Sequence, residues 1–209
     1  MDFPAQYADL STRDRMLVAA RTMFSERGFY GVSIAQVAAA LGMSKQALLH
    51  HFGSKERLYG EVLQSVSREL DSLLTKTVAE RGGGAECLAE IFVRLQPGDE
   101  ATTERSRLLV RELLDNARRA GDATTWYLAP FLGELETQLG RCENWRDTKL
   151  AVRRAALFRW LGAVEYTVIA GPTLRAIYGD EGSTAMWQET TRTLRSTMLA
   201  QISAGPPRG

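Results

Sequence analysis

The 209-residue chain is poor in the side chains that carry most enzyme chemistry. It contains two cysteines, Cys87 and Cys142, and two histidines, His50 and His51. The cysteines are far apart and have no metal-ligand spacing, so we expect two ordinary thiols. Both histidines lie in the first quarter of the chain, which excludes a histidine-based triad in the remainder. We therefore expect no catalytic residue, no metal and no cofactor, and we do not expect an enzyme.

Long apolar runs are also missing. No stretch of about 18 apolar residues occurs, and the first twenty residues lack the apolar core of a signal peptide. Hydrophobic residues make up 44% of the chain and charged residues 24%, as in globular proteins that bury a core. We expect a cytoplasmic protein without a membrane partner.

The net charge of +1 hides an uneven distribution. Between Arg13 and Arg57 there are seven basic and three acidic residues, a balance of +4, which leaves −3 for the remainder. A basic N-terminal segment attached to a mildly acidic body indicates an anionic partner for the front of the chain.

Helical spacing recurs throughout and nothing in the sequence predicts strands. Ser11 and Ser44 are expected N-caps, and Ser33 with Gln36 forms a capping box. Glycines end the first two helices, at Gly28 and Gly42. A fourth helix, capped by Ser54, carries a buried stripe at Leu58, Val62, Val66, Leu70 and Leu73. Two short helices joined by a tight glycine turn and braced by longer ones predict a helix-turn-helix.

Beyond the Gly82–Gly84 break the pattern predicts further helices. Their expected ranges are Ala85–Leu95, Glu104–Arg119, Thr125–Leu139, Thr148–Ala170 and Ser183–Ile202. The predicted fold is all-α with about nine helices. We expect a helix-turn-helix domain over residues 1–53, a larger helical domain over 54–204 and a disordered tail over 205–209.

The third helix separates its two histidines. At ~100° per residue, Lys45, Leu49, Gln46 and His50 share one exposed arc, whereas His51 points toward the buried side of the helix. This arc suits the DNA major groove, where lysine pairs with guanine, glutamine with adenine and an apolar side chain with the thymine methyl group. The cap residues Ser33 and Ser44, with Lys55, are expected to contact phosphates.

A polar arc on a short helix is more often only a solvated face, and His51 is more often packed than a ligand. Histidines at neighbouring helical positions diverge too far to share a metal. The DNA interpretation is favoured because this helix is the second helix of a helix-turn-helix.

Two motifs resemble the DNA-binding domain of TetR (tetracycline-repressor-like) regulators. The first runs from Ala20-Arg21 through Phe24 and Gly28 to Ser33 and Ala38. The second is the run Leu41-Gly42-x-Ser44-Lys45-x-x-Leu48-x-x-His51-Phe52-x-Ser54-Lys55-Glu56-x-Leu58. One departure is Leu49, where the family usually has a tyrosine, often a phosphate contact.

The resemblance implies a homodimer whose body holds a dimer interface and an effector pocket. It also implies DNA contacts at Ser33, Ser44, Lys45, Gln46, His50 and Lys55. In the family, the last two helices pair with those of the partner. Two apolar stripes fit that role, although packing within the protomer is the alternative: Leu157, Leu161, Val164, Val168, Trp187, Leu194 and Met198.

An effector pocket is expected to be mostly apolar with a few polar groups. The candidate wall residues are Leu109, Leu113, Asn116, Trp126, Phe131, Trp160, Glu165 and Tyr166. Glu165 lies inside an apolar run. It either meets a cationic or hydroxylated ligand or pairs with an arginine across the dimer, and the sequence favours the pairing.

Three functions are compatible with these features. The first is a ligand-responsive regulator, a repressor, that binds a near-palindromic operator and is released when a small molecule tilts the fourth helix. The second is a small helical enzyme, which the histidine distribution disfavours. The third is a helical interaction protein or nucleoid-type DNA protein without an effector.

Overall fold

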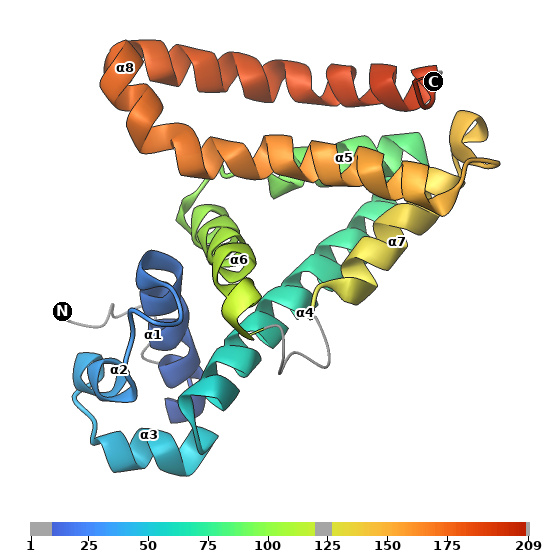
Figure 1. The fold of residues 1–209 in the computed structure, drawn as a ribbon. Helices are drawn as coiled ribbons and strands as arrows, with labels where there is room; N and C mark the ends of the chain where they lie inside the picture. Colours follow the sequence, from blue (N-terminus) through green and yellow to red (C-terminus); the bar gives the residue numbers. More distant parts are fainter. Residues whose placement is uncertain (1–9, 120–126, 208–209) are drawn as a thin grey trace. The chain divides into compact units, whose positions relative to one another are not determined.

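The computed structural model describes residues 10–119 and 127–207, and the side chains of residues 10–115 and 127–207. Over these residues the chain is helical, without strands (Figure 1). The elements are α1 (Thr12–Arg27), α2 (Ile34–Ala40), α3 (Lys45–Phe52), α4 (Lys55–Arg81), α5 (Ala85–Leu95), α6 (Glu100–Arg119), α7 (Ala129–Gly140), the 3-10 helix η2 (Glu143–Trp145) and α8 (Leu150–Ala204). The predicted all-α class is confirmed.

The chain divides into two compact units. Unit 1 comprises residues 1–68 and 107–127, and unit 2 comprises residues 69–106 and 128–209. The helices α4 and α6 each run from one unit into the other. The predicted boundary before Ser54 lies inside unit 1, and the domain limits and the disordered tail stay predictions.

Local hydrogen bonds set the helix ends of unit 1. The Ser11 and Ser44 hydroxyls accept from the backbone N–H groups of Asp14 and Ala47, both at 3.1 Å. Ser33 and Gln36 form the reciprocal capping box, with bonds of 2.7 and 3.2 Å. Each cap is made by a side chain three positions from its donor, so the sequence predicts it from local spacing.

The core of unit 1 is aromatic. Tyr59 on α4 is buried between Phe24 and Phe29, with ring centroids 4.8 and 5.1 Å away, and its hydroxyl donates to Glu112 of α6 at 2.8 Å. Two further contacts join α6 to α1 and the turn that follows it. Arg111 donates to the Ser25 carbonyl at 3.0 Å, and Asp115 accepts from the backbone N–H of Phe29 at 3.3 Å.

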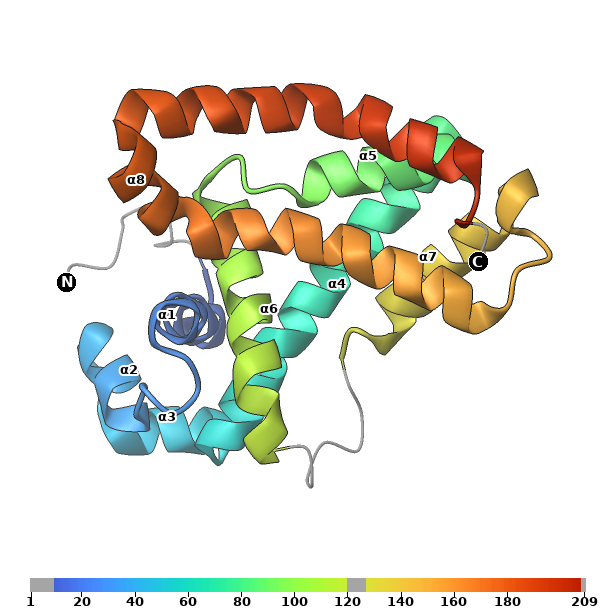
Figure 2. The same cartoon turned by 45° about the horizontal axis from the view of Figure 1, so that its top comes forward.

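Unit 2 is built around α5, whose apolar side packs on α8 and α7. The α8 helix bends back at Gly179, so its two limbs, residues 150–178 and 180–204, run side by side in both Figure 1 and Figure 2. Gly179 has φ 73° and ψ 175°, a backbone conformation that is essentially restricted to glycine. The two limbs correspond to the two helices that the sequence predicts over Thr148–Ala170 and Ser183–Ile202, with the bend between them.

Several predicted helix limits are wrong. The first limb of α8 continues past Ala170 and includes Pro172. The α6 helix begins at Glu100, because the Asp99 carboxylate accepts from the backbone N–H of Thr102 at 2.8 Å and caps it. Tyr127 and Leu128 form a turn, and α7 begins at Ala129 with a proline in its first turn.

The far end of α8 is tied to the segment that precedes it. The indole N–H of Trp145 donates to the carbonyl of Ile202 at 2.8 Å, and the Trp160 indole donates to the Gln201 side chain at 2.6 Å. The two indoles also meet edge to face, with centroids 5.8 Å apart. Trp145, which the sequence assigns to a break, is 1% exposed and belongs to the core.

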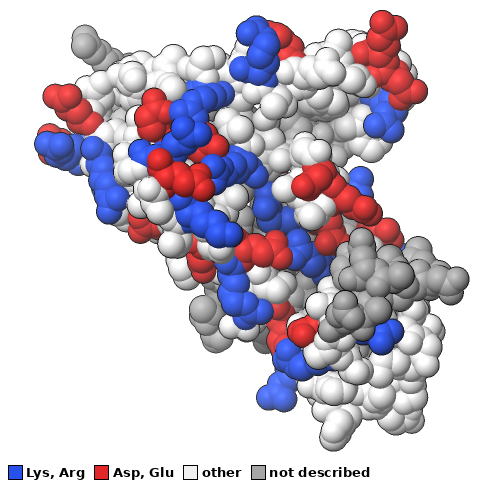
Figure 3. Space-filling model, turned by 180° about the vertical axis from the view of Figure 1, so that it is seen from behind, with Lys and Arg blue, Asp and Glu red and all other residues white. Residues whose placement is uncertain are grey.

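An ion-pair cluster joins α4, α5 and α8 within unit 2. Glu90 accepts from Arg94 at 2.9 Å and also pairs with Arg81 and Arg195. Figure 3 shows basic side chains lying against acidic ones over much of the face seen from behind. The arginines hold the pKa of Glu90 below its usual range, against the opposing effect of burial.

Within the described ranges, none of the helices combines the length and the apolar character that crossing a bilayer requires.

Candidate nucleic-acid interface

The third helix presents the expected polar edge. Lys45, Gln46 and His50 are exposed and Leu49 is half-buried, whereas Leu48 and Phe52 are buried. The helix is held by its N-cap at Ser44 and by Gly53 at its end, where φ is 75°. Leu48 and Phe52 fix the rotation of the helix, because turning the polar edge inward would expose both side chains.

His51 does not behave as the helical wheel predicts. Its side chain is exposed, and its ring lies 5.9 Å from that of His50 and 6.3 Å from that of Phe52. The prediction of a packed His51 is therefore wrong. At eight residues α3 is short, and only Leu48 and Phe52 face the core.

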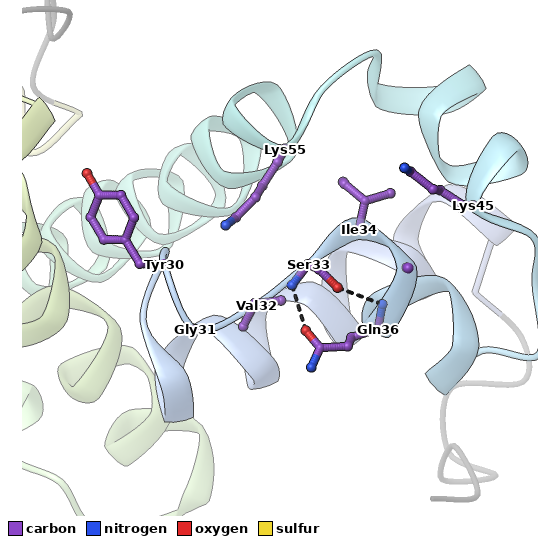
Figure 4. A pocket seen from close by; sticks show the side chains of 9 residues that line it. Tyr30, Gly31, Val32, Ser33, Ile34, Gln36, Lys45 and Lys55 are labelled. Carbon is purple, nitrogen blue, oxygen red and sulfur yellow. Dashed lines mark hydrogen bonds between the residues drawn. The ribbon is translucent and has the colours of Figure 1, made fainter.

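A hollow of about 400 Å³ opens beside the start of α2 and α3. Its lining includes Ser33, Gln36, Lys45 and Lys55, and Figure 4 shows the two lysines on opposite sides of Ser33. The hollow thus combines two cations with the polar groups at the start of a helix. Such a concave surface suits phosphate oxygens. Ser33 is exposed, and its hydroxyl hydrogen is not used by the capping box, in which its oxygen is the acceptor.

Lys55 has a second role that the sequence does not reveal. Its ammonium group lies 4.2 Å from the centroid of the Phe29 ring, a cation–π distance. Burial lowers the pKa of Lys55, partly offset by Glu56. The side chain is half-buried, so Lys55 both covers the aromatic core and lines the hollow.

Residues 16–62 match the family described as bacterial regulatory proteins of the tetR family. Over these residues the chain is similar to regulatory proteins of the tetR family. The matched residues include α2, α3 and the start of α4, which form the polar edge and the hollow.

Two curated TetR-like relatives illustrate how far the likeness extends. The chain is 34% identical to the transcriptional repressor AcnR of Corynebacterium efficiens over 73 residues, which is 35% of this chain and 37% of AcnR. It is 29% identical to the transcriptional regulator RutR of Escherichia coli K12 over 167 residues, covering 78% and 77% of the two chains. The match to AcnR therefore spans little more than a third of that relative's length.

A solved transcriptional regulator from Rhodococcus sp. Rha1 has the same fold. The two structures superpose with a TM-score of 0.68 over 95% of this chain and all of the other, at 22% identity. At this identity, the likeness shows a shared fold that includes the helical body, and it carries no information about ligand or operator.

The candidate effector residues belong to both units. Leu109 is buried and Leu113 exposed in unit 1, whereas Phe131, Trp160 and Glu165 lie in unit 2. Tyr166 is 62% exposed, so it does not line the interior of the protomer. Trp126 and the side chain of Asn116 lie outside the described residues.

The candidate dimer residues differ in burial. Leu157, Val164 and Met198 are each at most 3% exposed within the protomer, so they leave little surface for a partner. Leu161, Val168, Trp187 and Leu194 are half-buried. The first limb of α8 is apolar on both sides, and the side of Leu157 and Val164 is the covered one. The role of these residues in a dimer stays a prediction.

The opposite side of that limb carries the exposed stripe. Phe158, Tyr166, Ile169 and Ile177 are 74%, 62%, 56% and 63% exposed. Their spacing places them on one face at ~100° per residue. Contiguous exposed apolar side chains of this size mark an interaction surface.

Proposed function

We propose that this chain is a homodimeric, ligand-responsive transcriptional repressor that reads a near-palindromic operator with α3. The observation that carries the proposal is the exposed edge formed by Lys45, Gln46 and His50 on the second helix of a capped helix-turn-helix. Lysine and glutamine match the acceptor and donor patterns of guanine and adenine edges.

Dimerisation follows from the exposed stripe of α8. A second copy that covers Phe158 and Ile169 with its own equivalent residues would remove both from water. A two-fold dimer presents two recognition helices, and its half-sites lie about one helical turn or a multiple apart. The partner in this proposal is therefore the chain itself, with double-stranded DNA as the second ligand and a small-molecule effector in the C-terminal body as the third.

The DNA arm of the proposal is tested by footprinting. The protein is expected to protect a palindromic segment near its own gene, with affinity that falls steeply as salt rises. In the Gln46→Ala variant, discrimination at particular base pairs should weaken by about 1–3 kcal/mol, while other positions are unaffected. Binding of every site as tightly as the parent would contradict base reading by Gln46.

The dimer arm is tested by light scattering. Phe158→Glu places a charge in the proposed interface and is expected to yield a folded monomer that has lost operator binding. A matched control is Tyr178→Glu, beside the bend at Gly179 and 58% exposed. If both variants remain dimers, the stripe is not the interface.

A further inference from the structure

Unit 2 contains a carboxylate that its own surroundings do not satisfy. Glu165 lies on the first limb of α8, next to the buried Val164 and near the half-buried Leu161 and Val168. Its Oε2 atom has no contact with solvent and no hydrogen-bond partner. Its Oε1 atom accepts from the Ser106 hydroxyl of α6 at 3.5 Å, the outer limit of a hydrogen bond.

The charged groups near Glu165 do not supply a hydrogen bond to Oε2. Arg105 favours the ionised form of Glu165 through space, while its guanidinium donates to the backbone carbonyl of Arg94 at 3.3 Å. Burial prevails over both Ser106 and Arg105 and raises the pKa of Glu165 to about 7. A buried acceptor without a donor is costly, which marks Glu165 as a group that a donor from outside would stabilise.

An arginine from a second copy is a poor candidate for that donor. Oε2 is covered by the protomer's own atoms, and a bulky guanidinium on the partner's surface would have to displace them. Along α8, Glu165 lies seven residues after Phe158 and four before Ile169, so it leaves the helix close to the exposed stripe, and the cover over Oε2 separates it from a partner. This cover favours a ligand inside the protomer over the pairing across the dimer that the sequence favours.

We propose that Glu165 anchors the effector and that the effector carries an ammonium group or another N–H hydrogen-bond donor. The proposal rests on the function proposed above. The donor supplies the missing hydrogen bond at Oε2 and forms a charge-assisted bond with the carboxylate. When an ammonium binds the protonated acid, one proton passes to the solvent. A carboxylate or phosphate effector is disfavoured, because its charge would repel the ionised Glu165.

Three probes with one apolar chain and different head groups test the chemistry: hexylammonium, hexan-1-ol and hexanoate. Their binding to the full-length protein at pH 8 is measured by titration calorimetry. We expect hexylammonium to bind at least about tenfold more tightly than hexanoate, with hexan-1-ol between them. Equal or tighter binding of hexanoate, or no binding of hexylammonium at millimolar concentration, overturns the proposal.

The variant Glu165→Gln keeps the shape of the side chain and removes its charge. It is expected to abolish the preference for hexylammonium, whereas Glu143→Gln, an exposed position in the same unit, should retain it. If the variant does not fold, the pKa of Glu165 in the unmodified protein provides a second test. In carboxyl ¹³C NMR, saturation with hexylammonium is expected to lower the pKa of Glu165 by at least about one unit. An unchanged pKa contradicts the anchoring role.

Operator binding, measured on the same samples without any probe, separates the two proposals. If operator binding is intact but the head groups are not distinguished, the inference fails and the proposed function stands. If no specific DNA is bound, the proposed function fails, and the titrations still decide whether Glu165 recognises donors.

Discussion

The lysine of α3 and the arginines of the ion-pair cluster on α4, α5 and α8 have opposite surroundings. On α3 of unit 1, Lys45 is exposed and forms no ion pair with any described residue. On α5 and α8 of unit 2, Arg94 pairs with Glu80 and Glu90, and Arg195 pairs with Glu86 and Glu90. The pairs of unit 2 join helices that are distant in the sequence, whereas the lysine of unit 1 keeps its charge available for an external anion.

Net charge alone is therefore a poor guide to function. The positive balance between Arg13 and Arg57 indicates an anionic partner because the cations on α3 and α4 line an open surface. In the body, Arg81, Arg94 and Arg195 contribute little to the external field, because glutamates neutralise them in place. Four predictions are given in decreasing order of their effect on stability.

Removing the carboxylate at the centre of the ion cluster should have the largest effect. The Glu90 side chain is 12% exposed and lies among three arginines. Glu90→Ala leaves these cations close together without their shared partner and should lower the free energy of unfolding by about 3–5 kcal/mol. Urea denaturation measures this. Glu189→Ala, which removes an exposed pair with Arg192, should leave stability unchanged.

The second prediction concerns the dependence of stability on pH. Burial raises the pKa of Glu165 to about 7, above its usual value of 4.5. Below pH 4.5 the acid is neutral in both states. Between pH 4.5 and 7 only the unfolded chain releases its proton, so folding stability falls as pH rises, by about 3 kcal/mol in total.

Glu165→Gln should lack this loss. The measurement is the difference in unfolding free energy between pH 5 and pH 8, compared for the parent and the variant. The comparison isolates Glu165, because the other titrating groups are common to both proteins. If the parent and the variant lose stability equally over this range, Glu165 ionises as an ordinary surface acid.

The third prediction tests the bend of α8. A Cβ at Gly179 would meet no neighbouring atom, so the cost of Gly179→Ala arises from the backbone conformation alone. We expect a loss of about 1–3 kcal/mol in thermal or urea unfolding. Gly133→Ala, in the helical interior of α7 and also in open space, should instead stabilise the protein by up to about 1 kcal/mol. A neutral Gly179 variant would mean that the bend tolerates a side chain.

The smallest effect on folding is expected at Lys45. Lys45→Ala should leave the unfolding free energy within about 0.5 kcal/mol of the parent, because the side chain is exposed. Its DNA affinity should fall, with a salt dependence reduced by about one charge in the slope of log K against log salt. A loss of stability without a loss of DNA binding would place Lys45 with the structural cations of unit 2.

The helix-turn-helix was predictable because its information is local. The Ser33–Gln36 box and the Ser11 and Ser44 caps each depend on residues three positions apart, and Gly28 and Gly42 have positive φ where the first two helices end. None of these features depends on knowing what packs against the helix. The polar edge of α3 follows from the same local spacing.

The body was less predictable because its helices are apolar on more than one side. Leu157 and Phe158 are adjacent and equally hydrophobic, yet one is 3% and the other 74% exposed. The position of α5 decides which of the two side chains is buried, and the spacing of apolar residues along α8 does not reveal that position. Trp145 was missed for the same reason, since its partner Ile202 is 57 residues away. His51 shows a different limit of the helical wheel. The wheel places its side chain toward the core, but no described part of the chain covers it there, and it is exposed.

The hydrogen bond from the Trp145 indole to the Ile202 carbonyl determines where the end of α8 tolerates truncation or extension. The last carbonyls of a helix ordinarily face water and fray, but here one is held by a side chain that precedes the helix. The antiparallel limbs thus form a closed loop, joined by Gly179 at one end and by indole at the other. Trimming the chain before Ile202 opens that loop and exposes a buried fluorophore, whereas extending it beyond Gly205 leaves the closure intact.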